Sequence, residues 1–172
     1  IAGVLDDPAY VDYWANKWAD LLRPNPDRVG VKSVFMFDQW LRESFRQNKP
    51  YDQFVREQLA GDEIDPKNPD VLVGVSYLRN PIYEYNQRDA RGQYEVVLTD
   101  MTDNAGEVFL GLSFGCAKCH DHKFDPILQK DYYRLRAFFT PVRWRDDIKL
   151  ATEEEEARFA EQQAKWEEAT KD

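Results

Sequence analysis

The residues best suited to chemistry lie within seven positions of one another. The chain has two cysteines, Cys116 and Cys119, and two histidines, His120 and His122. A secreted protein stapled by disulfides would spread its cysteines through the chain. Thiols and imidazoles gathered in one short segment indicate instead a cofactor, a metal or redox chemistry.

The order Cys116-Ala117-Lys118-Cys119-His120 is the spacing used for covalent haem attachment. Two thiols three residues apart on a helical turn can each add to one vinyl group along the same porphyrin edge. The adjacent His120 then lies under the ring, where its imidazole can bind iron. The pattern predicts one haem c, covalently held by Cys116 and Cys119, with His120 as the proximal iron ligand.

Three other kinds of site are compatible with the same cluster: a zinc site, a redox-active thiol pair and a structural disulfide. A structural zinc ion needs about four ligands, and His122 is the only further cysteine or histidine in the chain. A thioredoxin-like redox pair requires a βαβ context, whereas this region has the pattern of helix and loop. A disulfide across two residues would close a very small loop and stabilise little.

The second axial ligand is less well defined by the sequence. His122 is too close to His120 in the chain to reach the opposite face of a haem. Methionine is the next choice, and the chain has two, Met36 and Met101. Met101 precedes the haem segment on a predicted helix, so we expect it to be the iron ligand ahead of Met36. A sixth position with no protein ligand is the third possibility.

The elements expected to position this cluster are helices. Asp7-Pro8 has the pattern of a helix start, a capping side chain followed by proline, and Thr152 with Glu155 forms a capping box. Further helices are predicted over residues 33–45, 50–60, 93–109 and 131–139. Gly61 is expected to end the helix over residues 50–60. Residues 71–75 fit a strand or a short helix, and residues 62–70 and 82–92 are expected to be loops.

These patterns predict a mostly α fold, an irregular helical domain with long loops around one covalently bound haem, plus a C-terminal acidic helix. Ten Phe, nine Tyr and five Trp can supply most of the core, and we expect the Trp- and Phe-rich helices to enclose most of the haem. The 172 residues suit one compact domain with an appendage. We predict a haem domain over residues 1–145 and an acidic helical tail or linker over residues 146–172.

The charge balance excludes some partners. The net charge is −9, so the chain lacks the basic footprint that nucleic acids or anionic membrane surfaces require. From Thr152 onward the net charge is −5, which leaves −4 for the larger part. No apolar run is long enough to span a bilayer, so we expect no membrane insertion by this segment.

Several blocks, in order along the first four-fifths of the chain, resemble one known family. They are Asp12-Tyr13-Trp14, residues 17–23, Trp40-Leu41-Arg42, and residues 48–59, 108–112, 116–127 and 131–133. The chain is similar to the domain of unknown function of secreted, cytochrome-like planctomycete proteins. The resemblance implies export, a haem c on Cys116 and Cys119 with His120 proximal, and a parent polypeptide that often carries a separate cytochrome domain.

Together these observations predict a mono-haem c-type cytochrome domain that transfers electrons within a larger periplasmic or extracellular protein. Its partner would be a redox protein or a neighbouring cytochrome domain of the same polypeptide. One alternative is an enzyme or sensor, a five-coordinate haem that binds a small ligand or peroxide. A second alternative is a non-haem structural module whose CxxC segment holds zinc or a disulfide.

Overall fold

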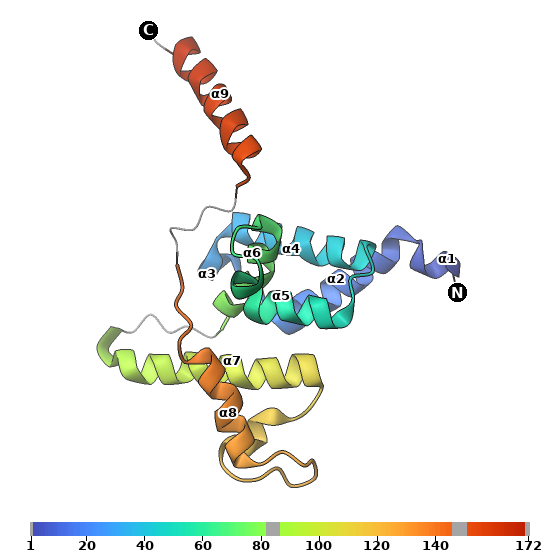
Figure 1. Cartoon of the computed structure of the whole chain (residues 1–172), viewed down its shortest axis with the longest axis vertical. Coiled ribbons are helices and arrows are strands. Elements are labelled where there is room, and N and C mark those ends of the chain that lie inside the picture. The colour runs from blue at the N-terminus through green and yellow to red at the C-terminus, as the bar shows by residue number, and fades with distance from the viewer. Residues whose placement is uncertain (1, 82–86, 146–150, 171–172) are drawn as a thin grey trace.

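The structure is a computed structural model of the chain that describes residues 2–81, 87–145 and 151–170. Its described residues form α-helices and short 3-10 helices with no strand, which confirms the mostly α class (Figure 1). No helix of these residues has both the length and the apolar character needed to cross a membrane. The elements are α1 (Ala2–Leu5), α2 (Pro8–Leu22), α3 (Pro26–Val29), α4 (Val31–Arg46), α5 (Tyr51–Ile64), α6 (Pro69–Val75), η1 (Ser76–Arg79), η2 (Gln87–Asp89), α7 (Ala90–Leu110), η3 (Phe114–Lys118), α8 (Gln129–Phe139) and α9 (Glu153–Ala169).

The same sequence pair begins three of the helices. Asp7, Asn25 and Asn68 each precede a proline at the first helical position, in α2, α3 and α6. The side-chain oxygen of each accepts a hydrogen bond from the backbone N–H two residues on, at 2.9, 2.9 and 3.1 Å. Such a cap satisfies a donor that the helix itself leaves unpaired. The cap at Asn68 also explains why the ambiguous segment 71–75 is helical.

The expectation that Gly61 ends the helix predicted over residues 50–60 is wrong. Helix α5 continues to Ile64, with a break in its regular backbone at Ala60 (φ −152°, ψ 30°). Gly61 is buried, and a Cβ at this position would lie 2.8 Å from the carbonyl oxygen of Val71. The missing side chain therefore lets α6 pack closely on α5 rather than terminating the helix.

A large aromatic core lies between α2, α4, α5 and α7. Trp18 meets Phe54 edge-on at 4.8 Å between ring centroids, and Trp40 stacks on Phe54 at 5.2 Å. Phe109 extends the cluster from α7, stacked on Trp18 at 6.2 Å. Aromatic pairs in these arrangements contribute beyond the area that they bury. We call the buried residues of this cluster the main core: Ala15, Leu22, Phe37, Trp40, Leu41, Phe54, Val73, Tyr77, Leu78, Val97, Leu98, Met101, Ala105, Phe109 and Phe139.

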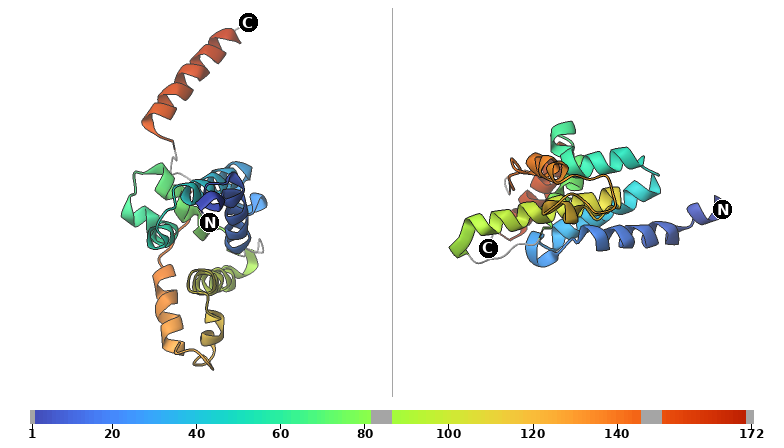
Figure 2. Two further views of the ribbon diagram at one scale, coloured as in Figure 1. Left: turned by 90° about the vertical axis from the view of Figure 1, so that its right-hand side faces the viewer. Right: turned by 90° about the horizontal axis from the view of Figure 1, so that it is seen from below.

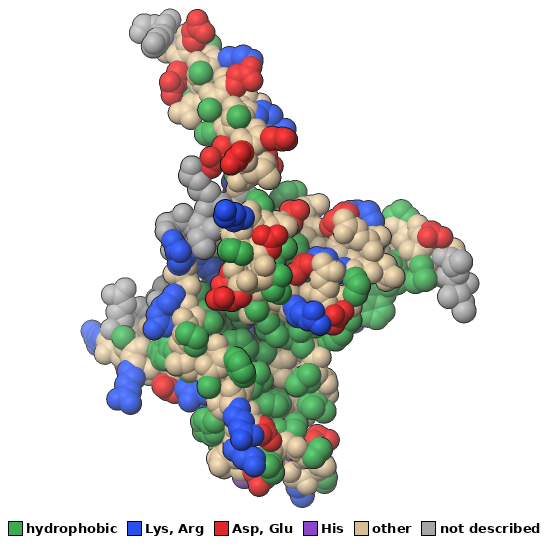
Figure 3. All heavy atoms as spheres, viewed as in Figure 1, with side chains coloured by type: hydrophobic (Ala, Val, Ile, Leu, Met, Phe, Trp, Pro, Cys, Tyr) green, Lys and Arg blue, Asp and Glu red, His purple; other side chains and the backbone are tan. Residues whose placement is uncertain are grey.

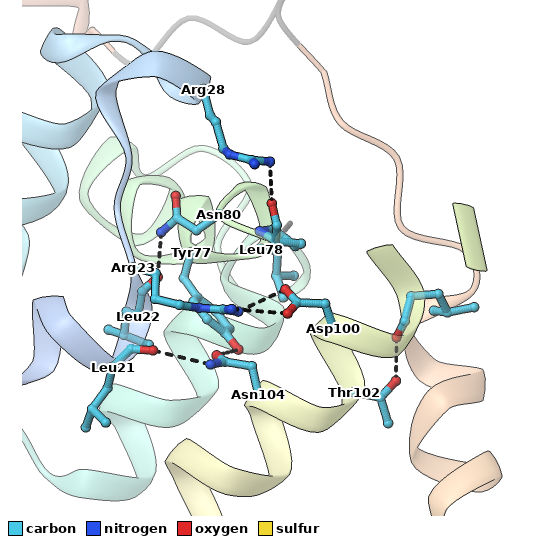
Figure 4. Close-up of polar contacts among 12 residues, drawn as sticks. Leu21, Leu22, Arg23, Arg28, Tyr77, Leu78, Asn80, Asp100, Thr102 and Asn104 are labelled. Atoms are coloured by element: carbon cyan, nitrogen blue, oxygen red, sulfur yellow. Dashed lines mark hydrogen bonds and ion pairs between the residues drawn. The ribbon is translucent and has the colours of Figure 1, made fainter. Parts of the chain in front are cut away.

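Polar contacts fasten α7 to the end of α2 (Figure 4). The guanidinium of Arg23 binds both carboxylate oxygens of Asp100, at 3.1 and 2.9 Å. The Tyr77 hydroxyl donates to the Asn104 side chain at 2.7 Å, and the Asn80 amide donates to the Leu22 carbonyl at 3.0 Å. Bidentate arginine–carboxylate pairs fix geometry as well as adding energy, so α7 is held firmly against the end of α2.

A second, smaller cluster lies on the other side of α7, where η3 and α8 pack (Figures 1 and 2). We call its four buried residues, Phe114, Ala117, Ile127 and Tyr132, the small core. The predicted helices over 93–109 and 131–139 correspond to α7 and α8, each beginning two or three residues earlier. Residues 82–86 of the predicted loop lie outside the described residues, and the prediction is wrong for residues 87–92, which form η2 and the start of α7.

Helix α9 stands apart from the rest of the molecule in Figure 1. It has the predicted capping box, in which the Thr152 hydroxyl accepts from the Glu155 backbone N–H at 3.3 Å and the Glu155 carboxylate accepts from the Thr152 N–H at 3.0 Å. Every residue of the helix is exposed. Residues 146–150 lie outside the described part of the chain, so the division into 1–145 and 146–172 stays a prediction.

Candidate functional site

The CxxCH segment is built on the 3-10 helix η3, with Cys119 as its C-terminal cap. A 3-10 helix has three residues per turn, so side chains three positions apart lie one above the other. Phe114 and Ala117 form one such pair and are buried, whereas Cys116 and Cys119 form another and are exposed free thiols. The helical period therefore places one pair in the small core and presents both thiols together on the surface.

The small core holds this turn against α7 and α8. The rings of Phe114 and Tyr132 stack with centroids 5.8 Å apart. Gly106 of α7 makes room for the turn, because a Cβ there would lie 2.4 Å from the Phe114 Cβ. Contacts this close leave the turn little freedom to shift along α7. The exposed thiols are therefore carried by a well-positioned backbone.

His120 follows directly and is exposed. Its Nδ1 lies 2.8 Å from the Asp121 carbonyl oxygen. A carbonyl only accepts hydrogen bonds, so Nδ1 donates here, and in the neutral imidazole the lone pair is then on Nε2, directed away from this contact. Histidines that bind metals are commonly held by such a bond from the other ring nitrogen. His120 thus has the tautomer that an iron ligand needs.

His122 has a different role. Only 7% of its side chain is exposed, and its Nδ1 accepts hydrogen bonds from the backbone N–H groups of Asp125 and Phe124, at 2.8 and 3.3 Å. The backbone N–H of His122 also donates to the Ile127 backbone carbonyl at 2.8 Å. An Nδ1 that accepts two bonds is unprotonated, so the Asp125 carboxylate 3.3 Å away is a neighbour rather than an ion-pair partner. His122 closes the loop that follows the motif.

Further bonds tie the motif to the start of α8. The Asp121 carboxylate accepts from the Gln129 N–H at 2.8 Å and so caps this helix. The Lys118 carbonyl accepts from the Gln129 side-chain amide at 3.1 Å and from the Tyr133 hydroxyl at 3.2 Å. The backbone on both sides of Cys119 is therefore fixed by α8.

A carboxylate that the sequence analysis missed lies beneath the turn. Asp103 of α7 is partly buried, and a Cβ at Gly115 would lie 3.3 Å from its carboxyl group. Burial raises the pKa of Asp103. Burial, and next the nearby Asp103 carboxylate, raise the pKa of Tyr132, which is fully buried. One Asp103 oxygen and the Tyr132 hydroxyl are enclosed without a hydrogen-bond partner of good geometry. The packing of α7 and α8 on η3, which sequence spacing does not reveal, brings this pair under the motif.

Both methionines lie in or against the main core rather than in the small core that holds the motif. Met101 is 4% exposed and belongs to the main core, and it lines a cavity of about 520 Å³ beside Phe139 at the end of α8. Met36 packs against the main core from α4. The assignment of Met101 as an iron ligand stays a prediction.

Within the described residues, no group of three or more His, Cys, Asp and Glu side chains converges as a metal site would require. The Nδ1 of His122 is also occupied by backbone donors. A four-ligand structural zinc site therefore has no ligand set in this part of the chain. A haem needs only one or two protein ligands to its iron, so this finding does not bear on the haem interpretation.

A model of the family described as PSCyt2, protein of unknown function (DUF1549), matches residues 1–144. The chain belongs to this family. The match includes the whole CxxCH segment, both clusters and all helices except α9. Neither a curated protein nor a solved structure matches the chain. Because the family is described as one of unknown function, membership assigns no activity, and the function rests on the site itself.

Proposed function

We propose that this DUF1549 domain is a mono-haem c-type cytochrome domain that transfers electrons within a larger exported protein. The observation that carries the proposal is the exposed pair of thiols on one face of η3, followed by a histidine with a free Nε2. Cys116 and Cys119 would hold the porphyrin through thioether bonds, and His120 would bind its iron. Such a haem supplies a one-electron iron couple.

The surroundings of the motif fit a large apolar group. Phe124, four residues after His120, is 84% exposed. Tyr133, whose hydroxyl binds the Lys118 carbonyl, is 45% exposed. Large apolar side chains left this open commonly mark a surface that something else covers. A porphyrin attached to Cys116 and Cys119 would cover part of this surface while keeping an edge in solvent.

The chain's own residues contribute positioning. The small core holds the thiol-bearing turn from below, and the Asp121 carbonyl fixes the His120 ring. His122 and Gln129 fix the loop and helix on either side of it. A rigid ligand set reduces the reorganisation that accompanies a change of charge. The exposed position of the motif suits exchange of electrons with a docked redox protein or a neighbouring cytochrome domain.

One observation favours a second candidate. Met101 and Met36, the candidates for the second iron ligand, lie in or against the main core and not in the small core. A haem with an open sixth position could bind a small ligand or peroxide and would act as a sensor or an enzyme. The ligation state of the iron separates this candidate from electron transfer.

The deciding measurement is a visible spectrum, oxidised and dithionite-reduced, of the chain produced in a periplasm with haem-attachment machinery, together with a pyridine haemochrome. We expect a covalent c-type haem with a low-spin reduced spectrum. A high-spin spectrum that shifts with carbon monoxide would support the second candidate. A colourless protein would refute both haem proposals and turn attention to metal analysis.

Variants of the two histidines provide a matched comparison. His120→Ala should retain covalent haem but change its spin state, because only the iron ligand is lost. His122→Ala should retain the spin state of the wild type while weakening the loop between residues 122 and 127. Equal spectral changes in both would argue against His120 as the proximal ligand. Met101→Leu and Met36→Leu then test the sixth position.

A further inference from the structure

Helix α9 carries an acidic surface and an exposed aromatic stripe. It contains seven glutamates against one arginine and one lysine. Phe159 and Trp166 are each 66% exposed and are seven residues apart, so they lie on the same side of the helix two turns apart. Glu155 and Glu156 lie four and three residues before Phe159 and therefore share this side. Two large exposed aromatic side chains on a polar helix indicate a docking face.

The body of the molecule has a hollow of about 680 Å³ with the complementary character. Apolar side chains of α4, η1 and the segment after α8 line it, among them Met36, Leu78 and Trp144. Four arginines, Arg28, Arg79, Arg143 and Arg145, line it too, against one acidic residue, Asp62. A hollow with apolar walls and excess positive charge fits an acidic amphipathic helix.

Two of these arginines, Arg28 and Arg143, are oriented by hydrogen bonds to backbone carbonyls. Arg28 donates to Pro81 at 3.0 Å, and Arg143 donates to Thr140 and Val142 at 3.3 and 3.0 Å. Carbonyl oxygens carry no net charge, so these bonds position the guanidinium groups without neutralising them. Their charge can still attract a carboxylate.

The base of α9 already lies near this hollow. The pKa of Glu155 is lowered mainly by the hydrogen bonds that its carboxylate makes with Thr152. The positive charge of Lys32 lowers this pKa further. Lys32 is next to Ser33, which lines the hollow. Figure 3 shows acidic side chains along α9 and basic side chains on the body beside its base. Seven residues join Arg145 to Glu153, and such a stretch spans at most about 25 Å when extended.

We propose that α9 folds back onto its own chain, with Phe159 and Trp166 over the hollow and Glu155 and Glu156 facing its arginines. This docking joins the acidic tail to the surface formed by α3, α4 and η1. It is independent of the haem site, since the hollow contains neither the CxxCH segment nor the small core.

Hydrogen exchange on the full chain tests this docking. Phe159→Ala with Trp166→Ala should speed exchange in α9 by about tenfold. Alanine is a better helix former than either aromatic residue, so in an undocked helix the same variant would slow exchange. Ala164→Ser, on the opposite side of α9, is the control and should have much less effect.

Two further measurements complete the test. The double variant should also speed exchange in the segment around Leu78, and raising the salt concentration should weaken protection in the wild type. Slower or unchanged exchange in α9 of the double variant would overturn the proposal. Protection that falls on dilution would also overturn it, because that result would place α9 on a second copy of the chain.

Discussion

The main core and the small core differ in what they are built to do. The main core joins helices from most of the chain through stacked and edge-on aromatic rings, and it buries Trp40, Phe54 and Phe109. The small core has four buried residues and supports one turn. Its outer surface carries the thiols and the free imidazole nitrogen. In this domain the largest packing stabilises the fold, and a minor cluster positions the chemistry.

The largest expected difference comes from truncating one phenylalanine in each core. Phe54→Ala should lower the free energy of unfolding by about 3–5 kcal/mol, because Trp18, Trp40 and Phe45 all pack on this ring. Phe114→Ala should cost about 2 kcal/mol or less, since the turn can collapse into the space or open locally. Chemical denaturation measures both. Equal losses would mean that the two clusters act as one core.

A smaller effect should follow from adding one methyl group under the motif. Gly106→Ala places a Cβ 2.4 Å from the Phe114 Cβ, an atom that cannot rotate away. We expect a loss of about 1–3 kcal/mol and faster hydrogen exchange confined to η3 and the start of α8. Gly3→Ala is the matched control, because nothing lies within 4 Å of a Cβ there. Exchange that speeds up throughout the main core would contradict a separate small core.

Each core also contains one buried tyrosine, and only one of the two hydroxyls makes a hydrogen bond of good geometry. Tyr77→Phe breaks the 2.7 Å bond to Asn104 and should cost about 1 kcal/mol. Tyr132→Phe removes a buried hydroxyl that lacks a well-formed bond and should be neutral within about 0.5 kcal/mol. Thermal or denaturant unfolding of the two variants measures the difference. A large loss in Tyr132→Phe would show that this hydroxyl does hold the small core together.

The sequence predicted the helices well where local chemistry decides them. The proline preceded by Asp7 and the capping box at Thr152 mark helix starts that depend on a few adjacent residues. Gly61 was misinterpreted because its role depends on Val71 of another helix. The strand-or-helix ambiguity at residues 71–75 was likewise settled by the cap at Asn68, a signal that the sequence did contain.

The motif was visible in the sequence, but its surroundings were not. Spacing alone placed Cys116, Cys119 and His120 in one segment, and a helical turn was expected there. The motif is exposed and lies on the far side of α7 from the aromatic core, whereas the enclosure of a haem by Trp- and Phe-rich helices stays a prediction. Asp103 could not be foreseen, because the contact with Gly115 joins residues twelve positions apart on different elements.

The smallest predicted effect on stability concerns the carboxylate of Asp103 and depends on pH. Burial raises the pKa of Asp103 in the folded state, so folding favours its protonated form. The stability that this group contributes is complete below its unfolded pKa of about 3.8. It is lost as the pH rises through the folded pKa. Asp103→Asn keeps a neutral side chain at every pH and should gain stability over the wild type as the pH rises above about 4.

The difference between variant and wild type, measured by denaturant unfolding at several pH values, cancels the titration of the other carboxylates. Asp6→Asn, at an exposed position, controls for the loss of one negative charge. A pH-independent difference would mean that solvent reaches Asp103 despite its burial. A gain that appears as the pH rises would show that the small core tolerates an ill-suited charge directly beneath the motif. At the edge of the main core, by contrast, the carboxylate of Asp100 is paired with Arg23.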